Sequence, residues 1–532
     1  MKSIGEALVA QLVERGVDTV FGIPGVHTIE LYRGLAESGI KHVTPRHEQG
    51  AGFMADGYAR VSGKPGVAFV ITGPGLTNTL TAMGQARADS VPMLVVSGVN
   101  QVASLGKGLG HLHELPDQLA LAQTVALHSE RLERSSDLLP ALDRAFGPFN
   151  SGRPGPTHIE VPLDVAGQEF AGSALSEGSK TTPKADAEFL AQAAQKLNSA
   201  KAPVILAGGG VRQSRALVQA LAERLDAAVV QTVNARGLMF EHPLGVPASP
   251  SLAAVRTLIE GADLVLALGT EIGQTDFDMY ATGTMARMPG LIRVDLCPDQ
   301  LARHEAEIAI EGDAAEVTSA LLSLLEGNDP AGEGSARAAK ARAGAMEEIG
   351  ADMRAACEVL DAMRDAVPEA LMVGDSVYPI YAGNLYYDHD RPGGWFNAAT
   401  GFGALGYGIP AAIGASLADP SAPVICIVGD GGAQFSLPEL MCAVDEKLPI
   451  TFVIWNNHGY QEIATSMQDA DVKVVGCDPT PPDFEFVARS CGMPFQRIKS
   501  DPHMVSEALQ QAQGVPGPRM VEIQTPNLAQ AN

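Results

Sequence analysis

The sequence is poor in cysteine, and its cysteines form no recognisable pairs. Six cysteines in 532 residues are scattered without a C-x-x-C pair, at Cys297, Cys357, Cys426, Cys442, Cys477 and Cys491. This spacing argues against a disulfide framework and against a zinc site, and it is typical of a reducing cytosol. We therefore expect a cytoplasmic protein with free thiols.

Basic residues are few relative to acidic ones. Lys and Arg together number 37 against 62 Asp and Glu, which gives a net charge of −25 at pH 7 and an isoelectric point near 4.8. Such a balance argues against nucleic acid and against an anionic membrane surface as partners. It is compatible with a cationic substrate, although acidic surfaces more often serve solubility.

Long apolar runs are missing as well. No run reaches the roughly 18 residues that a membrane-spanning helix needs. The first residues, MKSIGEALVAQL, are amphipathic, carry Glu6 early and lack the apolar core of a signal peptide. We expect neither a membrane span nor a secretion signal.

The chain is too long for one hydrophobic core, and about 150 residues per domain predicts three or four domains. Small polar stretches at residues 172–190 and 326–335 are typical of linkers, and an Ala-rich charged helix is expected over residues 336–360. These breaks predict three domains, at residues 1–171, 190–326 and 340–532.

Short apolar strands alternate with helical segments through all three regions. In the first, a helix at 4–14 precedes strands at 19–21, 67–71 and 93–96. In the second, strands are expected at 204–207, 228–230, 264–268 and 291–294. This alternation predicts an α/β fold of three doubly wound, mostly parallel sheets.

The most informative stretch runs from Val424 to Glu462. Its apolar opening, residues 424–428, predicts a buried parallel strand, and Gly429-Asp430-Gly431-Gly432 then turns the chain. Ser436 followed by Glu439 predicts a capping box at the start of a helix. A second apolar run, residues 450–455, ends in Asn456-Asn457-His458-Gly459, so the stretch is a βαβ unit.

Oxygen-bearing groups follow both strands of this unit. Asp430 supplies a carboxylate, Asn457 an amide oxygen and Gly459 a carbonyl, a set that suits Mg²⁺ or Ca²⁺ with positions left for phosphate oxygens. The glycines Gly429, Gly431 and Gly432 allow backbone N–H groups to approach an anion. The alternative is a tight turn and an Asx-turn in an ordinary α/β domain.

The 24 residues between Gly431 and Asn456 match the thiamine diphosphate motif G-D-G-x(24–28)-N-N. The chain therefore resembles the thiamine diphosphate-dependent enzymes of the acetolactate synthase and 2-oxo acid decarboxylase superfamily, along its whole length. The resemblance implies that the three domains are, in order, pyrimidine-binding, central and diphosphate-binding.

The resemblance also assigns roles to residues. Residues 46–60, RHEQGAGFMADGYAR, match the family stretch that carries the catalytic Glu. The resemblance implies that this residue is Glu48 and that it bonds the coenzyme's N1′. Without the match, a Glu at the start of a helix would be interpreted as a cap or as charge compensation. Gly403 would accept from the 4′-amino group, and Leu405 would keep the coenzyme bent, the alternative being a core Leu. The other implied coenzyme-binding residues are Asp375, Ser376 and Tyr460, together with the three glycines above.

The central region lacks a dinucleotide fingerprint. Gly208-Gly209-Gly210 follows a strand, but no G-x-G-x-x-G appears and no acidic residue ends the next strand, where Val230-Gln231 stands. Acetohydroxyacid synthases, which bind FAD, commonly carry R-F-D-D-R where this chain has residues 269–278, GTEIGQTDFD. We expect no FAD, and a Rossmann dehydrogenase is disfavoured.

Two segments bear on the substrate. LHELPDQ and LGTEIGQTDFDMY look most like those of the 5-guanidino-2-oxopentanoate (2-ketoarginine) decarboxylases, and the H-N-x-L-V stretch of synthases is missing at residues 126–129. A guanidinium tail prefers a bidentate carboxylate, which Asp276 or Asp278 could supply, the alternative being a solvated acidic loop. The candidate substrate residues are Gly25, His111, Glu271, Asp276 and Asp278.

The expected activity is decarboxylation of a 2-oxo acid to an aldehyde and CO₂, with His113 and Glu462 as candidate proton donors. Glu462 stands one position before the glutamate of simple decarboxylases. Two alternatives stay open, an acetolactate synthase-type carboligase acting on pyruvate and a non-catalytic coenzyme-binding subunit. Because the family builds each site from two subunits, we expect at least a homodimer and, from the resemblance, a homotetramer.

Overall fold

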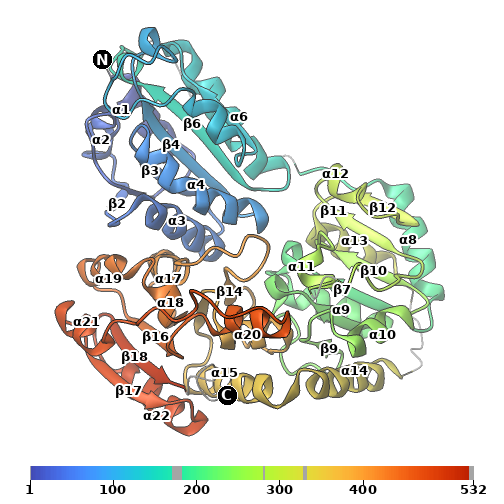
Figure 1. Ribbon diagram of the computed structural model, residues 1–532. Coiled ribbons are helices and arrows are strands. Elements are labelled where there is room, and N and C mark those ends of the chain that lie inside the picture. Colours follow the sequence, from blue (N-terminus) through green and yellow to red (C-terminus); the bar gives the residue numbers. More distant parts are fainter. Residues whose placement is uncertain (1, 171–181, 280–281, 327–331, 526–532) are drawn as a thin grey trace.

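The structure, a computed structural model, describes residues 2–170, 182–279, 282–326 and 332–525. Three six-stranded sheets follow one another along the chain, and all their strand pairs are parallel (Figure 1). The α/β class with three doubly wound sheets is therefore as predicted. Parts of both predicted linkers, residues 172–181 and 327–331, lie outside the described residues.

The first domain has the strand order β2-β1-β3-β4-β6-β5. Its central strands are buried along their whole length, which explains their continuous apolar sequence. The strands are β1 Thr19–Gly22, β2 Lys41–Val43, β3 Gly66–Val70, β4 Met93–Val99, β5 His128–Arg131 and β6 Pro156–Pro162. The helices are α1 Ile4–Glu14, α2 Ile29–Leu35, α3 Glu48–Ser62, α4 Pro74–Ala88, α5 Gln118–Gln123, α6 Leu138–Ser151 and α7 Leu163–Ala166.

The central domain has the strand order β12-β11-β10-β7-β8-β9, with its own hydrophobic core on each face. The strands are β7 Val204–Ala207, β8 Ala228–Gln231, β9 Gly245–Val246, β10 Val265–Leu268, β11 Ile292–Asp295 and β12 Ile308–Glu311. The helices are α8 Ala187–Ser199, α9 Arg215–Leu225, α10 Ala253–Glu260, α11 Gln274–Phe277, α12 Pro298–Leu301 and α13 Ala314–Leu324.

The third domain has the strand order β14-β13-β15-β16-β18-β17. The strands are β13 Leu371–Gly374, β14 Trp395–Asn397, β15 Val424–Gly429, β16 Ile450–Asn456, β17 Phe495–Lys499 and β18 Arg519–Gln524. The helices are α15 Gly350–Ala366, α16 Tyr378–Leu385, α17 Gly408–Ala418, α18 Asp430–Ala433, α19 Leu440–Asp445, α20 Gln461–Asp469, α21 Phe484–Ser490 and α22 Pro502–Gln513.

The single helix predicted over residues 336–360 is two helices, so that prediction is wrong. Helix α14, Gly334–Glu348, packs on α10 of the central domain, whereas α15 packs on α16 and α22 of the third. Gly350, at which α15 begins, has φ +79°, a left-handed conformation in which α14 cannot continue. The break lets the connection serve two domains (Figure 1).

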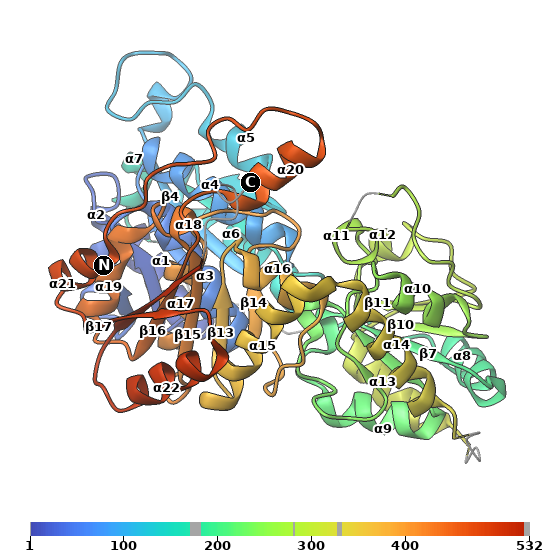
Figure 2. The same ribbon diagram turned by 60° about the horizontal axis from the view of Figure 1, so that its bottom comes forward.

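The first and third domains pack directly against each other, with the central domain to one side (Figure 2). Their contact is dominated by α3 against α17, and one hydrophobic core includes buried residues of both domains. Two glycines permit this approach: a Cβ on Gly57 would lie 2.0 Å from the Ala411 carbonyl oxygen, and one on Gly414 would lie 1.9 Å from the Met54 carbonyl oxygen.

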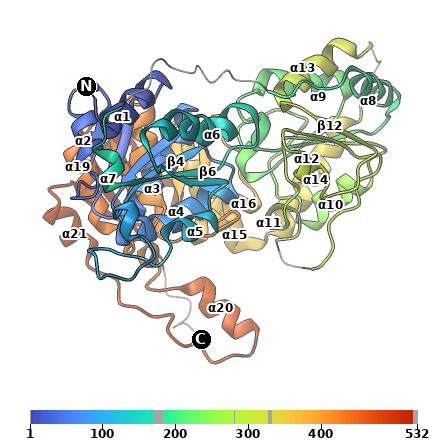
Figure 3. The same cartoon turned by 90° about the horizontal axis from the view of Figure 1, so that it is seen from above.

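Helix α20 stands away from the body of the third domain (Figure 3), and Ile463 on it is 52% exposed. In the residues that the structure describes, no helix has the length and apolar character to cross a membrane.

The helix crossing gives a first prediction. Gly414→Ala would place a Cβ against the Met54 carbonyl oxygen of α3. We therefore expect it to lower the free energy of unfolding by about 1–3 kcal/mol, the usual cost of overpacking, and to weaken the contact between the first and third domains. Thermal unfolding followed by circular dichroism measures the effect. Gly514→Ala is the control, because that glycine ends α22 with φ −86° and nothing within 4 Å of its Cβ. Equal melting temperatures for both variants would contradict the argument.

Candidate active site

The carboxyl ends of β15 and β16 bring the predicted metal ligands together. Strand pairing aligns Gly429 with Trp455, so the residues that follow each strand meet at one sheet edge. The Asn457 side-chain amide lies 3.1 Å from Asp430 Oδ1 and 2.8 Å from the Gly459 carbonyl oxygen. In the orientation that satisfies both contacts, the amide nitrogen donates to these two oxygens.

Asp430 is the residue that most favours the cation. Its side chain is 1% exposed, and its Oδ2 has no hydrogen-bond partner among the described residues. Burial raises the pKa of this carboxyl, although the Asn457 N–H donates to Oδ1 at 3.3 Å. A buried carboxylate with a free oxygen needs positive charge nearby, so the donor set fits a hard divalent cation.

Most of the predicted coenzyme residues line one small cavity of about 60 Å³ beside this site. The Tyr460 ring partly fills the space, because its Cε1 lies 2.4 Å from where a Cβ on Gly431 would be. The lining residues predicted from sequence are Ser376, Leu405, Gly429, Asp430, Gly431, Gly432, Asn457, Gly459, Tyr460 and Glu462.

Asp375 binds the loop that carries Leu405. Its Oδ2 accepts hydrogen bonds from the N–H groups of Gly406 (2.9 Å) and Gly408 (3.3 Å), and its Oδ1 accepts one from Ser376 (2.7 Å). Burial raises the pKa of this carboxyl to about 6, while the backbone donors oppose the shift. Asp375 thus fixes the shape of the segment that contains Gly403, which has φ +74°, and Leu405.

Glu48 is the first residue of α3 and is half-buried. Asn78 on α4 donates to its Oε2 at 3.0 Å, and the neighbouring Gln49 side chain reaches the Leu405 carbonyl oxygen at 3.5 Å. One chain therefore brings the Glu48 end of α3 beside the loop of the third domain that carries Leu405.

Glu439 is a site residue that the sequence did not reveal, and the predicted capping box is wrong. Ser436 makes no capping bond, and a short 3₁₀ turn, Leu437–Glu439, precedes α19. The Glu439 carboxylate instead accepts hydrogen bonds from the backbone N–H groups of Arg46 (3.0 Å) and His47 (2.9 Å), which lead into α3. Arg46 lies 393 positions away, so no local pattern could have indicated the contact.

Burial raises the pKa of Glu439 to about 7, against the lowering effect of its backbone donors, and the nearby Glu48 adds to the rise. The carboxyl is 1% exposed. The Glu439 carboxyl therefore fixes the start of α3 through its backbone hydrogen bonds, and it changes protonation close to neutral pH.

The predicted histidines and Gly25 lie in loops of the first domain. Gly25 exchanges hydrogen bonds with the Thr28 hydroxyl, whereas the His111 side chain is exposed. His113 is half-buried, and its ring faces that of His27, with 5.4 Å between the ring centroids.

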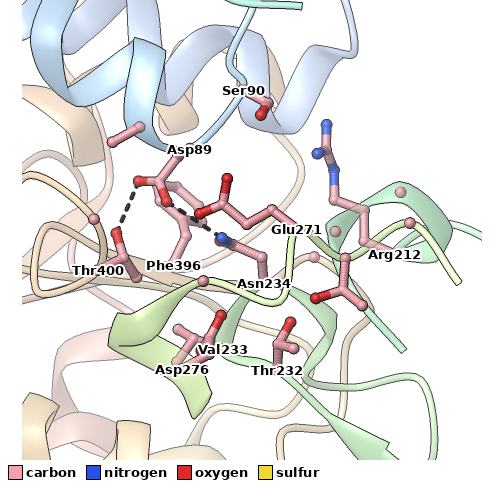
Figure 4. A pocket seen from close by; sticks show the side chains of 18 of the residues that line it. Asp89, Ser90, Arg212, Thr232, Val233, Asn234, Glu271, Asp276, Phe396 and Thr400 are labelled. Carbon is pink, nitrogen blue, oxygen red and sulfur yellow. Dashed lines mark hydrogen bonds between the residues drawn. The ribbon is translucent and has the colours of Figure 1, made fainter. Parts of the chain in front are cut away.

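The three acidic residues of the central domain do not line the cavity beside Asp430. Glu271 forms an ion pair with Arg153, at 2.7 Å, and Asp276, whose pKa burial raises to about 6, lines the same larger cavity as Glu271 (Figure 4). Asp278 accepts hydrogen bonds from Thr282 and Gly283, so its carboxylate shapes its own loop.

That larger cavity, about 450 Å³, lies where the three domains meet. Asp89, at the end of α4, accepts a hydrogen bond from Arg60 (2.7 Å) in its own domain. It also accepts from Asn234 (3.3 Å) in the central domain and from Thr400 (2.9 Å) in the third (Figure 4). Its side chain is 4% exposed. The carboxylate is thus a junction of all three domains.

Comparison with protein families matches the chain over most of its length. Residues 2–121 match the thiamine pyrophosphate enzyme N-terminal TPP binding domain, residues 190–321 the central domain and residues 373–523 the C-terminal TPP binding domain. Thiamine pyrophosphate and thiamine diphosphate are the same coenzyme.

Relatives of two kinds are similar to the chain. A Pseudomonas aeruginosa protein named a probable 2-ketoarginine decarboxylase, AruI, is 44% identical over 503 residues, 92% of this chain and 88% of that protein. The Escherichia coli acetolactate synthase isozyme 1 large subunit is 31% identical over 471 residues, 85% and 81% of the two chains. A Mycobacterium smegmatis X-ray structure, ascribed to a thiamin diphosphate-dependent enzyme, has a TM-score of 0.82 at 23% identity, covers 99% of this chain and 100% of its own, and shows the fold.

The Glu439 contact gives a second prediction. Because the folded state raises this pKa from 4.5 to about 7, the folded protein binds the proton more tightly than the unfolded chain does. The stabilisation is therefore fully present below about pH 4.5 and is lost as the pH rises through 7. We expect Glu439→Gln to remove this pH dependence, on the order of 3 kcal/mol between pH 4.5 and 7.5.

Urea unfolding at several pH values measures the difference between the parent protein and the variant. Glu311→Gln, at an exposed position of β12, is the control and should follow the parent. A Glu439→Gln profile parallel to that of the parent would show that the carboxyl does not titrate in this range.

Proposed function

The chain belongs to the thiamine pyrophosphate enzyme family, and from this we propose that it catalyses the non-oxidative decarboxylation of a 2-oxo acid to an aldehyde and CO₂. The observation that carries the proposal is the placement of Asp430, Asn457 and Gly459 together at one sheet edge, beside a cavity that Leu405 and Glu462 also line. Its relatives named as a 2-ketoarginine decarboxylase and as acetolactate synthases are enzymes of this coenzyme.

Mg²⁺ is the cation we assign to the three oxygens, and Ca²⁺ has the same ligand preference. Asp430, Asn457 and Gly459 would hold it, and Gly429, Gly431 and Gly432 would let backbone N–H groups approach the diphosphate. The buried Oδ2 of Asp430, which lacks a partner among the described residues, supports this assignment. We expect no FAD, because the central domain lacks the dinucleotide fingerprint.

Bound thiamine diphosphate supplies the electron sink that a 2-oxo acid needs to lose CO₂. Glu48 would be the carboxyl that bonds the ring nitrogen N1′, and the Asn78 amide, 3.0 Å from Oε2, holds that carboxyl in place. Leu405 would pack against the coenzyme and exclude water, and the Gly403 carbonyl would accept from the 4′-amino group. His113 and Glu462 are the groups that we assign to proton delivery at the product carbon.

The substrate we propose is 5-guanidino-2-oxopentanoate, which would yield 4-guanidinobutanal. Support comes from the similarity to the protein named a probable 2-ketoarginine decarboxylase and from the segments LHELPDQ and LGTEIGQTDFDMY. Asp276 lines the larger cavity between the domains, and Asp278 accepts a hydrogen bond from Thr282 of its own loop. Neither carboxylate is therefore assigned as the partner of the substrate's guanidinium group in these positions.

A second candidate function is acetolactate synthesis from pyruvate. It is favoured by acetolactate synthase large subunits from several bacteria, which are 30–33% identical to this chain. A non-catalytic coenzyme-binding subunit is disfavoured, because Glu48 and the full set of metal ligands are present. Cytoplasmic location and assembly as a homodimer or homotetramer are further parts of the proposal.

The metal site gives a third prediction. Asp430→Ala removes the charged ligand, so we expect magnesium-dependent affinity for thiamine diphosphate to fall about 100-fold, measured by calorimetry on EDTA-treated protein with Mg²⁺ restored. Glu48→Gln is the matched control, because it keeps the metal ligands; it should retain metal-dependent binding but lose turnover. Unchanged coenzyme affinity in Asp430→Ala would contradict the assignment of the cation to this site.

The substrate gives a fourth prediction. With Mg²⁺ and thiamine diphosphate, we expect kcat/KM for 5-guanidino-2-oxopentanoate to exceed that for pyruvate by about 100-fold. A site that binds the guanidinium group gains interactions with this substrate that pyruvate, which lacks the group, does not make. The assay measures CO₂ and the aldehyde over short, branched, aromatic and cationic 2-oxo acids. Acetolactate from pyruvate with no guanidino product would establish the second candidate instead.

A further inference from the structure

Two histidines of the first domain, His27 and His113, face each other, and His27 has no role in the proposed reaction. The rings of His27 and His113 lie 5.4 Å apart, centroid to centroid, and are tilted by 38°. His27 is 5% exposed, and the Nδ1 atoms of both rings are buried without a hydrogen-bond partner among the described residues. Buried polar atoms are seldom left unpaired, so this pair requires an explanation.

Each histidine packs closely against a glycine, at which any larger residue would clash with the histidine. A Cβ on Gly98 of β4 would lie 2.7 Å from the His27 carbonyl oxygen and 2.8 Å from its Cβ. A Cβ on Gly73 would lie 2.5 Å from the His113 carbonyl oxygen and 3.1 Å from its Cβ. The two backbones are therefore held at fixed positions on the sheet edge.

The loop that presents His113 is built around a carboxylate. Glu114 accepts hydrogen bonds from the backbone N–H groups of Leu109, Gly110 and His111, and Asn100 donates to the Leu112 carbonyl. His113 itself has φ +61°, a left-handed conformation that is strained for a non-glycine residue. Strain of this kind persists only where the surrounding contacts enforce it.

Helix α4 connects the pair to the candidate active site. Its cap residue Gly73 packs against His113 and donates to the buried Gln118 side chain, at 2.7 Å. One turn further on, Asn78 bonds Glu48. The histidine pair and Glu48 thus lie in loops and helix starts at the same edge of the first sheet, since both follow carboxyl ends of its strands.

We propose that His27 is a positioning residue, whose imidazole holds the His113 ring in the orientation in which His113 serves the active site. This inference rests on the proposed function only in taking His113 as the group that acts. Burial, together with the facing His113, lowers the pKa of His27, so His27 contributes to this pair as a neutral, packed ring.

The test compares His27→Ala, His27→Phe, His113→Gln and the double variant His27→Ala/His113→Gln. We expect His27→Ala to lower kcat about tenfold with little change in KM, and His27→Phe, which keeps a planar ring, to restore most of the loss. The double variant should be no slower than His113→Gln, because His27 acts through His113. Tyr32→Ala is the matched control, since Tyr32 packs on His42 at 5.1 Å in the same domain.

A second measurement does not require turnover. Diethyl pyrocarbonate modifies accessible imidazoles, and its rate at His113 can be followed by peptide mass spectrometry on the protein with and without coenzyme. We expect the His113 rate to rise several-fold in His27→Ala and to stay near the parent value in His27→Phe and Tyr32→Ala.

The two kinds of failure are distinguishable. Turnover with additive effects in the double variant and an unchanged His113 modification rate would overturn the role of His27 while leaving the proposed function intact. Absence of turnover on every 2-oxo acid would overturn the proposed function, and the modification rates would still decide whether His27 orients His113.

Discussion

The close crossing of α3 and α17 is the constraint on which the candidate site depends. Gly57 and Gly414 let the two backbones meet, and Tyr407 at the start of α17 then donates to Asp56 of α3 at 2.6 Å. The same Asp56 oxygen accepts from Arg60, also at 2.6 Å, so the buried charges are paired. Because this contact fixes α3 against the third domain, it also fixes Glu48, which begins that helix.

Two carboxyls near the candidate site, Glu439 and Asp375, accept hydrogen bonds from backbone N–H groups. Glu439 binds the N–H groups that lead into α3, and Asp375 binds those that shape the Leu405 segment. Both lie among apolar neighbours that raise their pKa values toward neutrality. The geometry of the start of α3 and of the Leu405 segment is therefore coupled to the protonation of these two carboxyls.

The sequence predicted the fold class and the local chemistry well because both leave periodic or contiguous signals. Alternating strands and helices predicted three parallel sheets, and the βαβ pattern of residues 424–462 predicted that Asp430 and Asn457 would follow neighbouring strands at one sheet edge. Contacts between distant segments left no such signal: Glu439 with His47, or His27 with His113, depend on how whole domains and loops pack. The broken helix was a different failure, since Gly350 was visible but a glycine ends a helix only in some contexts.

The placement of acidic residues refines the view of the central domain. Glu271 and Asp276 line the cavity where the domains meet, and Glu271 pairs with Arg153 of the first domain. Asp430, Asn457 and Gly459 line a separate, smaller cavity at the edge of the third sheet.

Asp89 has a consequence for how the whole chain melts. A single buried carboxylate that accepts from Arg60, Asn234 and Thr400 loses partners as soon as any one of the three folding units separates. An uncompensated buried charge of this kind is expensive, so departure of one unit destabilises the other two. Calorimetric heating should accordingly give one merged endotherm, and autonomous fragments cut from this polypeptide should be scarce.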